Sequence, residues 1–166
     1  RASRPNLISY HMGGSSTDVA LIGDCRPSVS NEIEIEYAMP IHVPMVDVRT
    51  IGAGGGSIAR VNEAGLLEVG PQSAGADPGP ICYGRGGELP TISDANMVLG
   101  RLDVGKLKSV LGAVGIEDIR AIFQTRLGDP LGVDAETAAA AVLRMATTRM
   151  AGATRMVSVS LGLDPR

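Results

Sequence analysis

The chain has 166 residues, about the length of one domain, and hydrophobic residues make up 44% of it, which is enough for a core. Its net charge is −3 and it has no basic run, which argues against a nucleic-acid-binding surface. We find no signal peptide and no apolar run of about 18 residues, so we expect no membrane-spanning segment. Because Cys25 and Cys82 do not make a disulfide framework, we expect a reducing, cytoplasmic environment.

The most distinctive stretch is the octet His-Met-Gly-Gly-Ser-Ser-Thr-Asp at residues 11–18. It lies between two apolar runs, Leu7–Met12 and Thr17–Ile22, which we predict to be adjacent antiparallel strands joined by a tight glycine turn. Free N–H groups and three hydroxyls at such a turn form a cradle for phosphate oxygens, although an ordinary hairpin turn fits the same residues. The candidate phosphate ligands are Gly13, Gly14, Ser15, Ser16, Thr17 and Asp18.

A strict alternation in Glu32–Tyr37 predicts a strand that buries Ile33, Ile35 and Tyr37 and leaves three glutamates in solvent. We expect it to be the third strand of the sheet that the first hairpin begins. His42 has no second metal ligand close in sequence, so we interpret it as a loop or packing residue.

A second glycine-rich stretch, residues 52–57, follows a predicted strand at Val46–Ile51. Its closely spaced glycines let the backbone come very near a partner, which is either a nucleotide or the neighbouring turn of the octet. Beyond it, Ser57–Val61 and Leu66–Val69 predict a second hairpin, with Gly65 in the left-handed conformation. The candidate close-approach residues are Gly54, Gly55, Gly56 and Ser57.

Residues 70–92 contain six glycines and four prolines. A structureless loop of this length inside a compact domain is uncommon, and is usually functional or a contact surface. We interpret Cys82 as a buried, inert thiol because no histidine is close to it in sequence. The roles of Cys82 and of Asp94, just beyond the loop, stay open.

The last third of the chain is predicted to be mainly helical. Ser93 can cap a short helix that stops at Gly100, and the apolar spacing of Ile116–Leu127 predicts a helix that stops at residues 128–130. Together with the hairpins, these helices indicate a mixed α/β layer in which residues 6–92 are β- and loop-rich.

The end of the chain is predicted to be a long helix followed by a strand. Asp134 can cap a helix from Ala135 to about Ala151, and Met156–Ser160 reads as a final strand. Residues 93–166 are therefore expected to be helical with a terminal strand.

Four stretches together, residues 11–18, 46–57, 70–87 and 91–96, resemble the hydantoinase A/5-oxoprolinase family. That family includes N-methylhydantoinase A subunits and the matching subunits of acetone and acetophenone carboxylases. The resemblance implies an actin/hexokinase-like (ribonuclease H-like) ATPase fold, in which two lobes clasp a nucleotide and each lobe supplies a phosphate-binding hairpin.

The octet matches the second of these hairpins, which implies that residues 13–18 bind the phosphates of ATP. Residues 1–166 would then be a single partial domain, mostly the second lobe. The first phosphate hairpin and the adenosine segment of the family have no counterpart here. We therefore expect both ends to be cut from a longer protein, and the fragment alone to be inactive.

The family octet opens with Asp where this chain has His11, while a family Thr is replaced by Ser15, which keeps the hydroxyl. A carboxylate at position 11 would bind Mg²⁺ or orient the attacking group, and an imidazole is a poor ligand for Mg²⁺. The catalytic and metal-binding residues are therefore left unassigned. Either Asp residues elsewhere take the metal role, or the ATP chemistry is weakened.

The resemblance implies an ATP- and Mg²⁺-dependent hydrolase that phosphorylates a lactam or hydantoin ring to activate it. Its partners would be a cyclic-amide small molecule and a hydantoinase B-type subunit or domain, and it could be a homo-oligomer. One alternative is a carboxylase-type subunit that activates a ketone as an enol phosphate. Others are a catalytically silent scaffold, which His11 favours, and a glycine-rich α/β domain without a nucleotide site. The sequence does not name the ring substrate.

Overall fold

The computed structural model describes residues 4–30, 33–35, 39–41, 44–103, 114–159 and 161–164. The chain divides into two compact units. Unit 1 comprises Arg1–His11, Asp18–Thr50 and Ala151–Arg166, and unit 2 comprises Met12–Thr17 and Ile51–Met150. The division passes through the first hairpin, so that its tip belongs to unit 2. A single partial domain over residues 1–166 stays a prediction.

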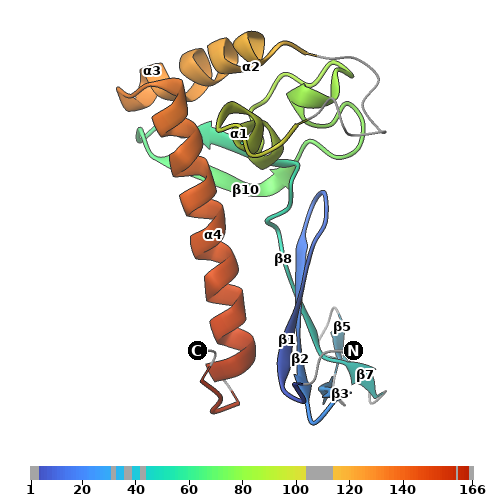
Figure 1. The fold of residues 1–166 in the computed structure, drawn as a ribbon. Helices are drawn as coiled ribbons and strands as arrows, with labels where there is room; N and C mark the ends of the chain where they lie inside the picture. The colour runs from blue at the N-terminus through green and yellow to red at the C-terminus, as the bar shows by residue number, and fades with distance from the viewer. Residues whose placement is uncertain are drawn as a thin grey trace. The chain divides into compact units, whose positions relative to one another are not determined.

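Unit 1 is built on the first hairpin. The strands β1 (Leu7–Met12) and β2 (Thr17–Gly23) are neighbours in one sheet, which confirms the predicted hairpin (Figure 1). The short strand β3 (Arg26–Pro27) pairs antiparallel with the end of β2, and β8 (Val48–Ile51) also pairs with β2. Strand β2 therefore lies inside the sheet, where Val19 is fully buried.

The prediction that Glu32–Tyr37 forms the third strand of this sheet is wrong. Its described part, β5 (Ile33–Ile35), pairs antiparallel with β6 (Met39–Ile41) in a separate sheet of two strands. Alternation predicts a strand but not its partner, and the nearest partner along the chain is β6. Tyr37 and His42 lie outside the described residues.

The predicted strand at Val46–Ile51 is broken into two. Strand β7 (Met45–Val46) pairs with β4 (Val29–Ser30), whereas β8 joins the sheet of β2. Asp47 lies between the two strands and donates its N–H to the carbonyl oxygen of Ser28, at 2.8 Å.

Unit 2 contains the second hairpin, which the sequence predicts correctly. Strands β9 (Ser57–Val61) and β10 (Leu67–Ser73) are antiparallel, and Gly65 in the turn has φ 74°. The register shifts between Val69 and Ser73, where β10 has a bulge.

The segment after β10 contains a short 3₁₀ turn, η1 (Ile81–Tyr83), and the helix α1 (Ile92–Val98). The N-cap of α1 is Thr91 and not the predicted Ser93. Thr91 and Asp94 form a capping box, in which each side chain accepts a hydrogen bond from the other residue's backbone N–H. Gly100, with φ 67°, ends the helix as predicted.

The helical segment that begins at residue 116 passes its predicted stop. Helix α2 (Ile116–Phe123) runs into a π-helical turn, η3 (Gln124–Gly128), and then into α3 (Asp129–Leu131). Pro130 lies in the first turn of α3, where a missing N–H is tolerated. The segment ends at Gly132, which has φ 69°.

The predicted final strand at Met156–Ser160 is wrong, because the preceding helix continues through it. Helix α4 extends over Ala135–Val159, and Asp134 caps it as predicted by accepting the N–H of Thr137 at 2.7 Å. Its buried positions continue at helical spacing through Ala153 to Val157, so Val157 extends the buried stripe of the helix, whereas Val159 is exposed.

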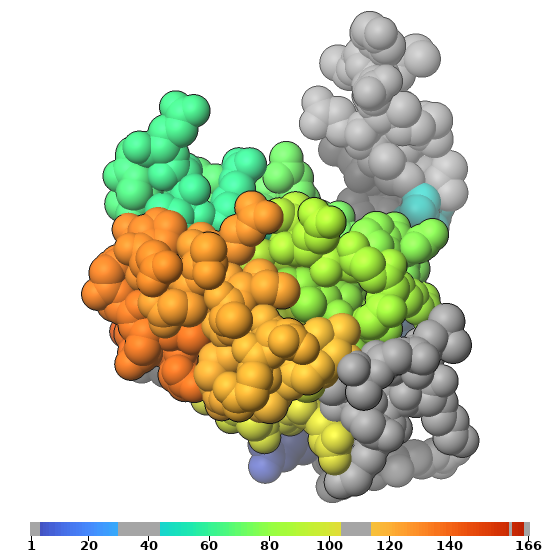
Figure 2. All heavy atoms as spheres, turned by 90° about the horizontal axis from the view of Figure 1, so that it is seen from above, coloured from blue at the N-terminus to red at the C-terminus, as the bar shows by residue number. Residues whose placement is uncertain are grey.

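The core of unit 2 is made of aliphatic side chains, alanines and the one phenylalanine, Phe123. Helix α2 packs against α1, which in turn contacts η1, and in the space-filling view the light-orange α2 lies beside the yellow-green segment (Figure 2). The alanine-rich start of α4, with Ala138, Ala139 and Ala146, packs into the same core. Within the described residues, no helix is long and apolar enough to cross a membrane.

Candidate functional site

The tip of the first hairpin is exposed and carries backbone donors. The N–H of Gly13 donates to the carbonyl oxygen of Ser16 at 2.8 Å and closes the turn. Gly14 and Ser15 are exposed, and their N–H groups have no acceptor among the described residues. A Cβ placed on Gly14 would meet no atom within 4 Å. The tip therefore presents unpaired N–H groups to solvent.

The glycine-rich loop 54–56 holds this tip through its backbone. The N–H of Gly55 donates to the carbonyl oxygen of Gly13 at 3.0 Å, and that of Gly56 to Gly14 at 2.6 Å. A Cβ on Gly54 would lie 2.6 Å from the backbone nitrogen of Ser16 and 2.7 Å from the carbonyl carbon of Gly14. The sequence leaves either a nucleotide or the turn of the octet as the partner of this loop. In the structure, the loop contacts the turn of the octet.

The structure separates the six predicted phosphate ligands into two sets. Thr17 is fully buried, and its hydroxyl donates to the carbonyl oxygen of Ala53 at 2.5 Å. Asp18 accepts a hydrogen bond from the hydroxyl of Thr50 at 2.7 Å. These two side chains are engaged with neighbouring loops and strands. The tip itself consists of Gly13, Gly14, Ser15 and Ser16.

Two serines that are distant in sequence contact the hairpin tip or the glycine loop that holds it. The hydroxyl of Ser73 donates to the hydroxyl of Ser15 at 3.2 Å, although 58 residues separate them. Ser93, the predicted cap, donates its N–H to the carbonyl oxygen of Gly55 at 2.8 Å. No local pattern marks these contacts, because each joins two segments that are distant in sequence. The predicted Ser57 accepts the N–H of Gly54 at 2.8 Å and stabilises the glycine loop from within.

A buried carboxylate organises the segment that precedes α1. Asp94 is fully buried and accepts the N–H groups of Cys82 at 2.7 Å and of Ile81 at 3.3 Å. It also accepts the N–H of Thr91 at 3.0 Å and the hydroxyl of Thr91 at 2.7 Å. Four donors around two oxygens satisfy a buried charge, so Asp94 serves the packing of this segment.

Cys82 is fully buried, as the sequence predicts. Burial, and then the negative charge of Asp94, raise the pKa of the Cys82 thiol well above its ordinary range. A thiol held protonated in this way is a poor nucleophile.

The remaining candidates concern a metal ion. His11 is exposed and lies near the end of β1. Among the described residues, no group of three or more His, Cys, Asp and Glu side chains could hold a metal ion. Mg²⁺ that binds together with a nucleotide needs only one or two carboxylates beside water and phosphate oxygens. The free N–H groups of the hairpin tip fit phosphate oxygens.

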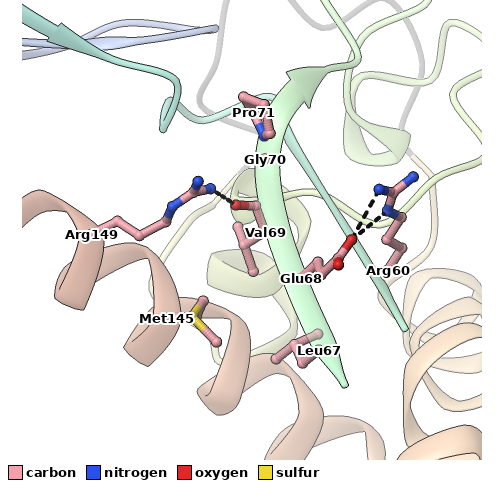
Figure 3. A pocket seen from close by; sticks show the side chains of 8 residues that line it. All are labelled: Arg60, Leu67, Glu68, Val69, Gly70, Pro71, Met145 and Arg149. Atoms are coloured by element: carbon pink, nitrogen blue, oxygen red, sulfur yellow. Dashed lines mark hydrogen bonds and ion pairs between the residues drawn. The ribbon is translucent and has the colours of Figure 1, made fainter. Parts of the chain in front are cut away.

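A separate hollow of about 410 Å³ lies between β10 and α4 (Figure 3). Arg149 of α4 reaches across it and donates a hydrogen bond to the carbonyl oxygen of Val69. On the other side, Arg60 forms an ion pair with Glu68 at 2.9 Å. The arginine side chains at this hollow are therefore engaged within the fold: Arg149 links α4 to β10, and Arg60 links β9 to β10.

The fold is α/β with antiparallel sheets, and it is shared with ATP-dependent enzymes of known structure. The structure of the ATP-dependent caprolactamase from Pseudomonas jessenii matches with a TM-score of 0.85 and 38% identity, over 98% of this chain and 23% of that one. The nucleotide-free acetone carboxylase, from a study of ATP-dependent acetone carboxylation, matches with a TM-score of 0.84 and 29% identity, over 97% of this chain and 23% of that one.

The chain belongs to the hydantoinase/oxoprolinase family, whose model matches residues 1–166. It is 42% identical to the caprolactamase subunit alpha of Pseudomonas jessenii, over 97% of this chain and 23% of that protein. The chain thus spans about a quarter of the length of these relatives.

Proposed function

We propose that this chain is the phosphate-binding part of an ATP-dependent hydrolase that opens cyclic amides. The observation that carries the proposal is the hairpin tip, where Gly14 and Ser15 expose free N–H groups. Four further predictions belong to it: an actin/hexokinase-like lobe, Mg²⁺ as the metal of the nucleotide, a cytoplasmic location and a hydantoinase B-type partner.

Each residue at the tip has a stated task in this proposal. The N–H groups of Gly14 and Ser15 donate to phosphate oxygens, and the hydroxyls of Ser15 and Ser16 add further donors. Because Gly54 and its neighbours hold the tip by main-chain contacts, the donors are already in place before the nucleotide arrives. We assign Thr17 to supporting the tip, since its hydroxyl is engaged with Ala53.

The chemistry of a ring amide explains the need for ATP. An unactivated amide is a poor electrophile, and bound ATP would supply a phosphoryl group that activates its oxygen. Phosphoryl transfer requires positioning and charge stabilisation more than covalent catalysis by the protein. The N–H groups and hydroxyls of the hairpin tip would supply part of the positioning and part of the charge stabilisation.

A carboxylase subunit is the second candidate. The acetone carboxylase structure matches this chain with nearly the same TM-score as the caprolactamase does. The higher sequence identity to the caprolactamase favours the hydrolase.

The test is nucleotide binding to the intact protein by calorimetry, with Gly14→Val as the variant. A Cβ on Gly14 meets no atom within 4 Å, so the fold should persist while the added side chain shields the donors. We expect ATP affinity to fall at least about tenfold, the loss of one to two charge-assisted hydrogen bonds.

The matched control is Gly23→Val. Gly23 ends β2, and a Cβ there also meets no atom within 4 Å. Its ATP affinity should equal that of the wild type. Equal ATP affinity of Gly14→Val and Gly23→Val would remove the hairpin tip from the nucleotide site.

A further inference from the structure

We propose that Ser73 is a positioning residue that makes the Ser15 hydroxyl a hydrogen-bond donor toward the nucleotide phosphate. The proposal rests on the proposed function of the hairpin tip. It assigns a role to the loop after β10, which that function does not otherwise use.

The geometry around Ser73 sets the direction of its hydrogen bonds. The Ser73 oxygen accepts the N–H of Gly75 at 3.1 Å, and its own hydroxyl donates to the oxygen of Ser15 at 3.2 Å. A serine hydroxyl has one proton and two acceptor lone pairs, so accepting the Gly75 N–H leaves the Ser73 proton available for the Ser15 oxygen. In this arrangement Ser73 donates and Ser15 accepts.

Ser15 consequently has its proton left for a ligand. Its oxygen already accepts from Ser73, and its side chain makes no other hydrogen bond among the described residues. An anion at the exposed tip would accept the Ser15 proton and complete a chain of donors from Gly75 through Ser73. Hydrogen bonds in such a chain strengthen one another, so the 3.2 Å contact should shorten when an anion binds.

The backbone around Ser73 keeps this arrangement in place. The N–H of Ala74 donates to the carbonyl oxygen of Gly56 at 2.8 Å, and Gly56 in turn donates to Gly14. A Cβ on Gly56 would lie 3.0 Å from the Ser73 oxygen and 3.1 Å from the carbonyl oxygen of Gly14, so this hydroxyl packs closely against the glycine loop. The bulge that shifts the register before Ser73 is where β10 turns into this contact.

The test is a double-mutant cycle on the intact protein, with Ser15→Ala, Ser73→Ala and the double variant. ATP affinity is measured by calorimetry. If Ser73 acts through Ser15, Ser73→Ala weakens ATP binding about three- to tenfold, and the double variant binds no more weakly than Ser15→Ala.

Two further variants serve as a control and as a substitute for Ser73→Ala. Ser28→Ala changes a similarly half-buried serine in unit 1 and should bind ATP like the wild type. Ser73→Cys keeps the shape of the side chain with a weaker donor, and replaces Ser73→Ala if that variant does not fold.

The outcomes separate the two proposals. If Ser15→Ala and Gly14→Val both bind ATP normally, the proposed phosphate site falls and the role of Ser73 falls with it. If Ser15→Ala weakens binding but Ser73→Ala does not, only the role of Ser73 is overturned. Losses that simply add in the double variant also overturn it, because independent contributions are not positioning.

Discussion

Gly54 and Gly14 pack backbone against backbone, so closely that a Cβ on Gly54 would lie 2.7 Å from both the carbonyl carbon and the carbonyl oxygen of Gly14. No real Cβ contact is that short, and the nearby atoms are main chain, which cannot rotate away. The loop after β8 therefore positions the hairpin tip without any side chain of its own. This close packing is possible because Gly54 has no Cβ.

Gly54→Ala should destabilise the intact protein by about 1–3 kcal/mol, the usual cost of overpacking a well-packed site. The added methyl would push Gly14 and Ser16 away from the loop. Urea unfolding, followed by circular dichroism, measures the change in the free energy of unfolding.

Gly152→Ala is the matched control for this substitution. Gly152 lies within α4, and a Cβ there meets no atom within 4 Å. In a helix interior the change should stabilise by up to about 1 kcal/mol. An unchanged unfolding midpoint for Gly54→Ala would contradict the close packing of the two glycines.

Asp94→Asn should destabilise the protein by at least about 2 kcal/mol. The amide keeps one acceptor oxygen and turns an N–H₂ group toward backbone donors that the carboxylate now accepts. Unfolding by urea gives the size of the loss. Mass-spectrometric mapping of alkylation should also show Cys82 reacting earlier than in the wild type.

Asp77→Asn serves as the comparison, because Asp77 is exposed. It should change neither the unfolding midpoint nor the reaction of Cys82. If Asp94→Asn behaves like Asp77→Asn, the carboxylate does not organise the segment around η1.

The cap of α4 predicts an acid-dependent loss of stability. Hydrogen bonds from the Thr137 hydroxyl and from its N–H lower the pKa of Asp134. Its folded-state pKa therefore lies below the unfolded value of about 4. The cap stabilises the fold above that value, and the stabilisation is lost as the pH falls through the folded-state pKa.

Asp134→Asn isolates this contribution, since asparagine caps helices well but does not titrate. Its Tm should fall less steeply than that of the wild type below about pH 4, and Asp134→Ala should have a lower Tm at neutral pH. Thermal unfolding between about pH 2.5 and 7 supplies both profiles. Parallel profiles for the wild type and Asp134→Asn would rule out the linkage.

His11→Asp should tighten binding of ATP in the presence of Mg²⁺ and weaken binding of ATP without the metal. A carboxylate near the end of β1 adds a hard oxygen ligand and a negative charge. Ser9→Asp adds the same charge one step farther along the same face of β1 and should have a smaller effect. If His11→Asp leaves affinity unchanged in both conditions, position 11 does not contact the nucleotide and its metal.

The sequence predicts the local elements better than their partners. Glycine turns and alternating apolar residues identify both hairpins, and Asp134 identifies the start of α4. The pairing of β5 with β6 could not be predicted, because alternation defines the faces of a strand and not its neighbour. The end of α4 is predicted wrongly because Val157 and Val159 alternate with serines as in a strand, whereas the continuing helix buries Val157.

The candidate site divides in a similar way. The exposed tip at Gly14 and Ser15 follows from the octet itself, because two glycines followed by small hydroxyl residues between two apolar runs favour a tight turn. The contacts that complete it, from Gly54 and from Ser73, join residues about 40 and 58 positions away and leave no local pattern. The burial of Thr17 likewise depends on Ala53, a tertiary neighbour.

The division between the two units passes through one hairpin, so neither unit is a continuous stretch of chain. Unit 2 takes the tip, Met12–Thr17, from the middle of a hairpin whose other residues belong to unit 1. A recombination event with a single crossover would therefore cut one unit apart whenever it moved the other. The tip and loop 54–56 form one packing unit, so a hairpin transferred from another protein would lack the loop whose backbone is complementary to it.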